Sequence, residues 1–210
     1  MSHRRRAALG LVAALLLLPV ATYAVDLMRE VKARLADAPL LRGHFQQQKS
    51  VAGFKTRLSS SGEFLLWRDR GVLWHTRKPV DSTLVLTRDT LTVQSGSSGR
   101  TVGAPLDASH EPALRAMNEL MFALLTADVP ALQARFRVEG ELVGSEGWKL
   151  ALTPTEAGLS RVLRRVMLEG DRHVRHARIE EANGDVTEIL FDQMGDAPPA
   201  SAEEARRLGG

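Results

Sequence analysis

The chain has 210 residues, no cysteine, and 28 Lys and Arg residues against 25 Asp and Glu residues, which gives a formal net charge of +3. The absence of cysteine excludes disulfides, thiolate metal sites and cysteine nucleophiles. Hydrophobic residues make up 44% of the chain and charged residues 25%, which is the composition of a globular domain and not of a disordered or collagen-like chain. The length suits one folded domain.

The first 24 residues have the three parts of a secretory signal peptide. Three arginines at 4–6 are followed by an apolar run over 7–18, and small residues precede a cleavage point after Ala24. The run is short for a bilayer and ends at Pro19, although an uncleaved membrane anchor is the alternative. Without this segment the basic and acidic residues are equal in number. The basic excess therefore belongs to an export signal, which predicts a secreted or periplasmic protein, and net charge gives no argument for nucleic acid.

Residues 25–194 are expected to form one α+β domain. Asp26 is positioned to cap a helix that runs to about Asp37, and Pro39 ends it. Beyond it the hydrophobic period changes to two, which predicts five consecutive strands, over 41–49, 55–67, 72–77, 82–87 and 90–94. Their connections are too short for crossover helices, so the strands should pair as an antiparallel meander.

The second half of the domain is expected to hold two helices and five more strands. A Gly- and Ser-rich loop over 95–107 precedes a helix that starts near Pro112, and Asp128 caps a shorter one. Asn183-Gly184 predicts a type I′ turn before the last strand. Residues 195–210 are expected to be a flexible C-terminal tail. The predicted strands cover 136–143, 148–153, 162–169, 173–181 and 186–193.

No group of residues in the sequence is arranged for catalysis or metal binding. His173 and His176 are three apart on a predicted strand, so they face opposite sides and are poor ligands for one metal. The Gly- and Ser-rich stretch 95–99 lacks the spacing of a nucleophile elbow and of a P-loop. Glu180 and Glu181 are adjacent on a strand and point apart. We therefore expect no enzyme, no catalytic residue, no metal and no cofactor.

Apolar residues share faces of neighbouring predicted strands. Phe64 and Leu66 lie on one side of their strand, and Val72 and Trp74 lie on one side of the next. An ordinary hydrophobic core accounts for this pattern. Arg68 has the same parity as Phe64 and would point into an apolar face, unless the alternation ends at the turn after it and the side chain is solvated.

Several motifs resemble the periplasmic outer-membrane lipoprotein carrier (LolA/LolB-like) family, of which the chain would be a divergent member. The stretch Ser61–Arg68, followed by Trp74 and Pro79, looks like the N-terminal signature of that family. Phe45-Gln46-Gln47 resembles its Phe-x-Gln strand, and Trp148–Pro154 resembles its Leu-Thr-Pro strand. The resemblance extends over most of the chain between Leu27 and Gln193.

The resemblance implies an incomplete, curved antiparallel β-barrel, a half-barrel, with helices as a lid over a hydrophobic cavity. It also implies that Arg68 latches the lid and that Trp74 lies in the cavity. The lipid-binding residues expected on this basis are Phe45, Phe64, Leu66, Arg68, Val72, Trp74, Leu84, Leu86, Met117, Leu120, Met121, Leu124, Leu150 and Leu152.

The function implied by the resemblance is that of a monomeric periplasmic chaperone. It would shield the acyl chains of a lipoprotein or other amphiphile and carry it from an inner-membrane exporter to an outer-membrane acceptor. Asp69, Val72 and the chain after Met194 depart from the family pattern, which suggests instead a paralogue for export of glycolipid or polyene-type lipids. Two further alternatives are an envelope assembly factor that docks membrane partners without carrying lipid, and a lipid hydrolase, which the missing nucleophile disfavours.

Overall fold

The computed structural model describes residues 20–87, 90–96, 100–101, 106–107, 122, 129–196 and 198–209. Four helices are present in these residues: α1 (Val20–Arg34), α3 (Val129–Arg135), α4 (Ala157–Ser160) and α5 (Ala202–Arg207). The strands of the first half are β1 (Leu40–Ser50), β2 (Arg57–Trp67), β3 (Gly71–Lys78), β4 (Ser82–Leu86), β5 (Thr90–Ser95), β6 (Arg100–Thr101) and β7 (Leu106–Asp107). Those of the second half are β8 (Phe136–Val143), β9 (Gly147–Pro154), β10 (Leu163–Gly170), β11 (Val174–Glu181) and β12 (Val186–Gly195).

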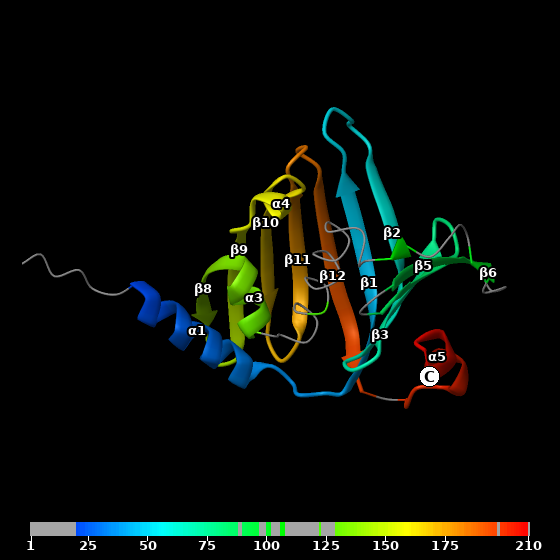
Figure 1. Cartoon of the computed structure of the whole chain (residues 1–210), viewed down its shortest axis with the longest axis horizontal. Helices are drawn as coiled ribbons and strands as arrows, with labels where there is room; N and C mark the ends of the chain where they lie inside the picture. The colour runs from blue at the N-terminus through cyan, green and yellow to red at the C-terminus, as the bar shows by residue number, and fades with distance from the viewer. Residues whose placement is uncertain are drawn as a thin grey trace, which may run out of the picture.

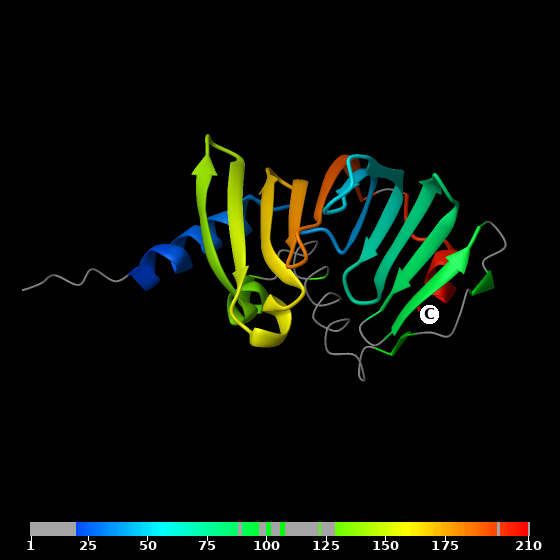
Figure 2. The same cartoon turned by 90° about the horizontal axis from the view of Figure 1, so that it is seen from above.

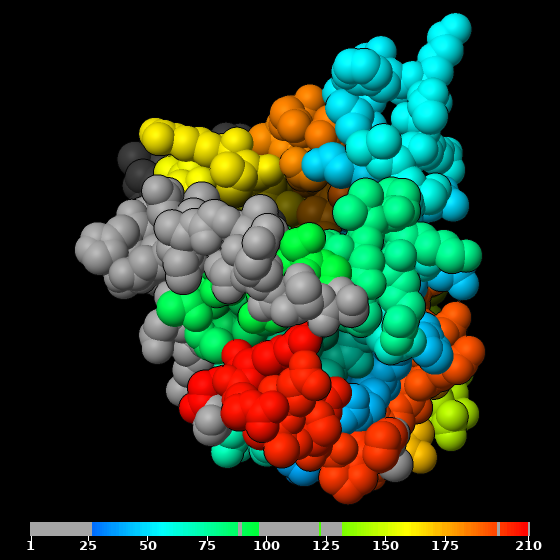
Figure 3. Space-filling model, turned by 90° about the vertical axis from the view of Figure 1, so that its right-hand side faces the viewer, coloured from blue at the N-terminus to red at the C-terminus, as the bar shows by residue number. Residues whose placement is uncertain are grey.

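All these strands belong to one antiparallel sheet that is not closed. Within the described residues the order is β6-β5-β4-β3-β2-β1-β12-β11-β10-β9-β8, with β7 paired to β5. The sheet therefore ends at β6 and at β8, which lie at opposite sides of the molecule (Figure 1). Seen from above, the sheet bends into an arc (Figure 2). The β1–β2 hairpin rises above the other strands at the top of the arc (Figures 1 and 3).

The last strand joins the two halves of the sheet. β12 pairs with β1 on one side and with β11 on the other, and Phe191 lies opposite Phe45 in this register. Apart from this pairing of β12 with β1 and the pairing of the short β7 with β5, the paired strands are next to each other in sequence. The predicted meander and the predicted strands of both halves are thereby confirmed, with ends that shift by one or two residues.

The expected α+β class is wrong for the described residues, which are mostly β with few, short helices. The helix expected from Pro112 lies outside these residues except for Phe122, which packs against the main core. The two other expected helices are present as α1 and α3. α1 begins at Val20, so Asp26 lies inside the helix and the cap predicted at Asp26 is wrong. In α1, Met28 and Val31 are buried, as their shared face predicts.

The two faces of the sheet carry separate hydrophobic clusters. On the inner face, α1 and α3 pack through Met28, Val31 and Leu132 against residues of β1–β4 and β8–β12. On the outer face, Leu208 after α5 packs against Leu65, Leu73 and Val85. These three side chains alternate along their strands with the side chains that point to the inner face. Strands β2, β3 and β4 are therefore covered on both sides. Figure 3 shows the C-terminal segment, in red, spread over this side of the molecule.

The residues after β12 are not simply the flexible tail that we expected. Ser201 caps α5, because its hydroxyl accepts a hydrogen bond from the Glu204 N–H while the Glu204 side chain accepts one from the Ser201 N–H. Arg42 of β1 donates to both carboxylate oxygens of Glu204 at 2.8 Å. The helix is thus fixed to the sheet by an ion pair and by Leu208. No helix in the described residues combines the length and the hydropathy needed to cross a bilayer.

Candidate functional site

An aromatic cluster lies at the centre of the inner face. The rings of Phe45 and Trp74 stack with their centroids 4.0 Å apart, and Phe64 stacks more distantly on Trp74 at 6.1 Å. Phe191 meets Phe64 and Trp74 edge-on at 5.6 and 6.1 Å. The three longer separations lie in the range of about 4.5–7 Å that is typical of favourable aromatic pairs. The cluster joins three neighbouring strands of the first half to β12 and makes the middle of the sheet strongly apolar.

Most of the expected lipid-binding residues lie on this one face. Leu84 is partly buried and packs against the inner cluster. Met117, Leu120, Met121 and Leu124 fall outside the described residues. The buried members of the inner cluster from that set are Phe45, Phe64, Leu66, Val72, Trp74, Leu86, Leu150 and Leu152. Their role in binding lipid remains a prediction, because burial in a shared core fits an ordinary core as well.

The aromatic member from β12 was missed in the sequence. Phe191 and Ile189 share the inner face, and their alternation in the last strand is the signal that identifies them. No sequence pattern predicts that they lie beside β1, because the pairing of the last strand with the first links residues almost 150 positions apart along the chain.

Arg68 lies just beyond the end of β2, so the alternation of the strand does not extend to it. Its side chain is 37% exposed, and its Nη2 atom donates to the carbonyl of Ala38 at 3.0 Å and pairs with the carboxylate of Asp37 at 2.5 Å. Both partners belong to the connector between α1 and β1. Arg68 is therefore bonded to this connector. Its expected latch to the lid stays a prediction, because the helix expected from Pro112 lies outside the described residues except for Phe122.

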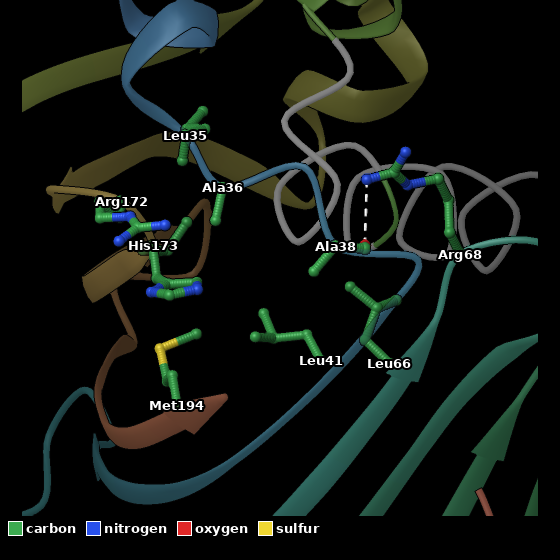
Figure 4. Close-up of a pocket in the computed structure, with 10 residues that line it drawn as sticks. Leu35, Ala36, Ala38, Leu41, Leu66, Arg68, Arg172, His173 and Met194 are labelled. Carbon is green, nitrogen blue, oxygen red and sulfur yellow. Dashed lines mark hydrogen bonds between the residues drawn. The ribbon is translucent and has the colours of Figure 1, made fainter. Parts of the chain in front are cut away.

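A small pocket lies behind this connector (Figure 4). Its volume is about 30 Å³, which is room for about one water molecule. Leu41, Leu66 and Val174 form an apolar part that belongs to the inner cluster. Arg172 and His173 lie together on one side and Arg68 lies on the other (Figure 4). The remaining lining residues are Leu35, Ala36, Ala38 and Met194.

The β10–β11 turn fixes the polar side of the pocket. The Arg172 carbonyl accepts a hydrogen bond from the Ala36 N–H at 2.8 Å, which ties the turn to the connector. Asp171 accepts from the His173 N–H and from the Arg175 side chain. Burial, followed by the charge of Arg175, lowers the pKa of His173, and Arg172 adds to this effect. The imidazole is therefore neutral at pH 7.

Two larger hollows elsewhere are polar. One, of about 430 Å³, lies on the outer face beside α5 and contains His44, Glu63 and His75. Another, of about 610 Å³, runs along the β1–β2 hairpin. Arg77 donates to both oxygens of Glu63, and His75 lies 2.7 Å from Asp81. The Nδ1 atom of His44 and the Oδ1 atom of Asp192 are buried without a hydrogen-bond partner within the described residues. No group of three metal-ligating side chains occurs among the residues whose positions are described.

The chain is thus a mostly β protein, built on an open, curved antiparallel sheet with an apolar inner face. The family model of the outer membrane lipoprotein carrier protein LolA matches residues 37–204, and the chain belongs to this family. LolA-family proteins are non-enzymatic periplasmic carriers, which gives the chain a lipoprotein-carrier-like role in outline. No curated protein sequence matches the chain.

Two solved structures with TM-scores of 0.50 show the same fold at low identity. A DUF1329 family protein from Desulfovibrio piger is 12% identical, with a TM-score of 0.50 over 87% of this chain and 96% of that one. A domain provisionally assigned as an outer membrane lipoprotein-sorting protein from Vibrio parahaemolyticus is 10% identical, with a TM-score of 0.50 over 88% and 96%. A LolA superfamily protein from Nitrosomonas europaea is 10% identical, with a TM-score of 0.47 over 84% and 94%.

Proposed function

We propose that the protein is a periplasmic chaperone that holds the acyl chains of a lipoprotein or another amphiphile against the inner face of its sheet. In this role it carries the amphiphile from the inner to the outer membrane. The segment 1–24 acts as a signal peptide that is cleaved after Ala24. An inner-membrane exporter and an outer-membrane acceptor are its transient partners.

The need for such a carrier follows from the cost of exposing acyl chains to water. Each methylene group moved from hydrocarbon into water costs about 0.8 kcal/mol, so a 16-carbon chain costs on the order of 12 kcal/mol. A lipoprotein therefore does not cross an aqueous space alone at a useful rate. A protein that offers an equivalent apolar surface removes most of this cost.

The inner aromatic cluster is the observation that carries the proposal. Phe45, Phe64, Trp74 and Phe191 join the apolar sides of four neighbouring strands, β3-β2-β1-β12, into one surface of an unclosed sheet. Flat, rigid rings offer a large apolar area to a flexible chain at little cost in side-chain entropy. Arg68 supports the proposal from the edge of this surface. Its bonds to Ala38 and Asp37 hold the connector in place and must break before the connector can move away and admit an acyl chain.

The proposal is tested by lipid content and by binding of a neutral probe. Protein purified without detergent is examined by native mass spectrometry, and extracted lipid is identified. Binding of the uncharged probe N-phenyl-1-naphthylamine is measured by its fluorescence. We expect copurified lipid, micromolar probe affinity, and displacement of the probe by a diacylglycerol.

Two leucine variants separate the inner face from the outer surface. Leu84→Glu places a charge on the partly buried inner face and should weaken probe binding at least tenfold, because a carboxylate there opposes acyl contact. Leu190→Glu places the same charge on an exposed position of β12 and should leave binding unchanged. Absence of both copurified lipid and probe binding contradicts the carrier role and favours a docking factor that carries no lipid.

A further inference from the structure

We propose that the pocket between the α1–β1 connector and the β10–β11 turn binds the anionic headgroup, a phosphate or a carboxylate, of the carried amphiphile. This inference rests on the proposed function and goes further, because it names the charge of the cargo and the place of its headgroup. Arg172 and His173 lie on one side of the pocket and Arg68 lies on the other, and Leu41 and Leu66 belong to its apolar lining.

The first argument concerns the hydrogen-bond and ion-pair partners of the two guanidinium groups. Arg172 is exposed, and its side chain makes no ion pair or hydrogen bond with any described residue. Arg68 is paired only with the connector, through Asp37, whose side chain is 86% exposed, and through the Ala38 carbonyl. Guanidinium groups bind phosphate and carboxylate with two parallel hydrogen bonds. One guanidinium is thus available, and the other holds a carboxylate that a ligand can replace.

The second argument is an unsatisfied imidazole atom beside Arg172. The Nδ1 atom of His173 is buried and has no hydrogen-bond partner within the described residues. A buried polar atom without a partner costs free energy, so a ligand that supplies a partner is favoured. The charges of Arg175 and Arg172 lower the pKa of His173 while that of Asp171 raises it, so these three neighbours together carry a net positive charge. An anion relieves this repulsion, whereas a cation adds to it.

The third argument is the continuity of the pocket with the inner face. Leu41, Leu66 and Val174 line the pocket and also belong to the inner cluster that contains the aromatic rings. A headgroup held by the arginines therefore has its acyl chains beside the apolar face. In the present conformation the pocket holds about one water, so a headgroup enters only when the connector moves away from Arg68. Asp37 then acts as an internal anion that occupies Arg68 while the carrier is empty.

The test compares an anionic amphiphile with its neutral ester. The probes are 16-(9-anthroyloxy)palmitic acid and its methyl ester, titrated by fluorescence into the purified protein at low salt. We expect the acid to bind at least tenfold more tightly. Arg172→Ala should remove most of this preference and leave ester affinity unchanged. Arg164→Ala, at an exposed position of β10 that does not line the pocket, is the control and should preserve the preference.

A second variant tests the internal anion in the opposite direction. Asp37→Asn removes the competing charge from Arg68 and should raise affinity for the acid severalfold, with no change for the ester. Because a loss of folding does not strengthen binding, this gain is specific to the proposed exchange. A dihexanoyl phosphatidic acid should displace the bound fatty acid probe, whereas inorganic phosphate should not do so at the same concentration.

Two results overturn the headgroup site, and they differ from the result that overturns the carrier role. Equal affinity for acid and ester, or equal loss of both in Arg172→Ala, shows that the arginines do not recognise a headgroup. Displacement by inorganic phosphate alone shows a free-anion site with no link to the amphiphile. If neither acid nor ester binds, the apolar face takes up no acyl chain, and the proposed function itself is wrong.

Discussion

Single leucines of the sheet differ in how much the fold depends on them. Leu152 of β9 has no exposed surface, and it lies within the same cluster as Trp148 and Leu150. Leu190 of β12 is 53% exposed and belongs to neither cluster. Both are leucines on central stretches of strands, so sequence alone treats them alike. They differ because the side chain of Leu152 points to the buried face of the sheet, whereas that of Leu190 points to the exposed face.

Leu152→Ala should lower the free energy of unfolding by about 2–5 kcal/mol, because it opens a cavity in a packed core. Leu190→Ala should change the free energy of unfolding by less than about 0.5 kcal/mol, since its side chain is half in solvent. Both values are measured by urea denaturation followed by tryptophan fluorescence. An equal loss in the two variants would show that the inner face is not the packed side of the sheet.

Arg68 illustrates how a residue-level ambiguity is resolved. Its parity with Phe64 predicted a charge on the apolar face, and the alternative was a solvated side chain beyond the strand. β2 ends at Trp67, and Arg68 is partly exposed and bonded to the α1–β1 connector. The end of the strand is a local event, but the partners of Arg68 come from about 30 residues earlier in the chain.

At the level of elements, α5 lies in the stretch that the sequence analysis predicted to be a flexible tail. Ser201 and Glu204 have the Ser-x-x-Glu spacing of a capping box, which is a recognisable signal for a helix start. The helix is only six residues long, and such short helices are not stable alone. Its stability comes from Leu208 and from the pair between Arg42 and Glu204, which local spacing does not reveal.

Glu204 provides a pH-dependent test of this docking. Hydrogen bonds from Arg42, opposed by partial burial, and further bonds from Ser201 lower the pKa of Glu204 from 4.5 to about 2. Because the folded pKa is the lower one, the stabilisation is complete above about pH 4.5 and is lost as the pH falls toward 2. Amide hydrogen exchange in α5, measured by NMR, should therefore accelerate over this range before the sheet unfolds.

Arg42→Ala should return the pKa of Glu204 toward 4.5 and make exchange in α5 fast already at neutral pH. Glu203→Gln is the matched control, because Glu203 pairs with Arg207 inside the helix and does not contact Arg42. It should leave the titration of Glu204 unchanged. A carboxyl titration of Glu204 near 4.5 in the unaltered protein would disprove the docking pair.

The turn at Asn183-Gly184 is a second element-level correction. A type I′ turn requires positive φ at both central residues, but Gly184 has φ +94° while Asn183 is not among the residues with positive φ. The Gly184 N–H donates to the Glu181 carbonyl at 3.1 Å, and the Glu181 N–H donates to Asp185 at 2.9 Å. The connection is therefore a longer loop with one left-handed glycine, and the predicted type I′ turn is wrong.

At the scale of the whole molecule, β12 holds the two halves of the sheet together. It pairs with β1 and with β11, and its Phe191 joins the aromatic cluster of the first half. Among the described strands, β1 and β11 have no direct pairing to replace it. Loss of β12 therefore exposes two sheet edges and part of the inner cluster together.

Two truncations test this arrangement. A chain ending at Gly195 loses α5 but keeps every described strand, so it should unfold cooperatively with modestly reduced stability. A chain ending at Asp185 loses β12 and should lack a cooperative transition and the near-ultraviolet circular dichroism of packed tryptophans. Both are compared with the full chain by urea denaturation. Cooperative folding of the shorter chain would show that the two halves fold without the joining strand.

The sequence by itself determined the strands of five or more residues, their antiparallel order within each half, the helices α1 and α3, and the family, but not the short strands β6 and β7, which lie in the stretch predicted to be a loop. These features depend on the alternation of apolar residues, on turn residues and on short motifs, all of which act over a few neighbouring positions. Tertiary structure alone decided the place of β12 beside β1, the docking of α5, and the pocket that brings Arg68 to Arg172 and His173. These features join residues a hundred or more positions apart, so their energies arise only when the whole sheet has formed.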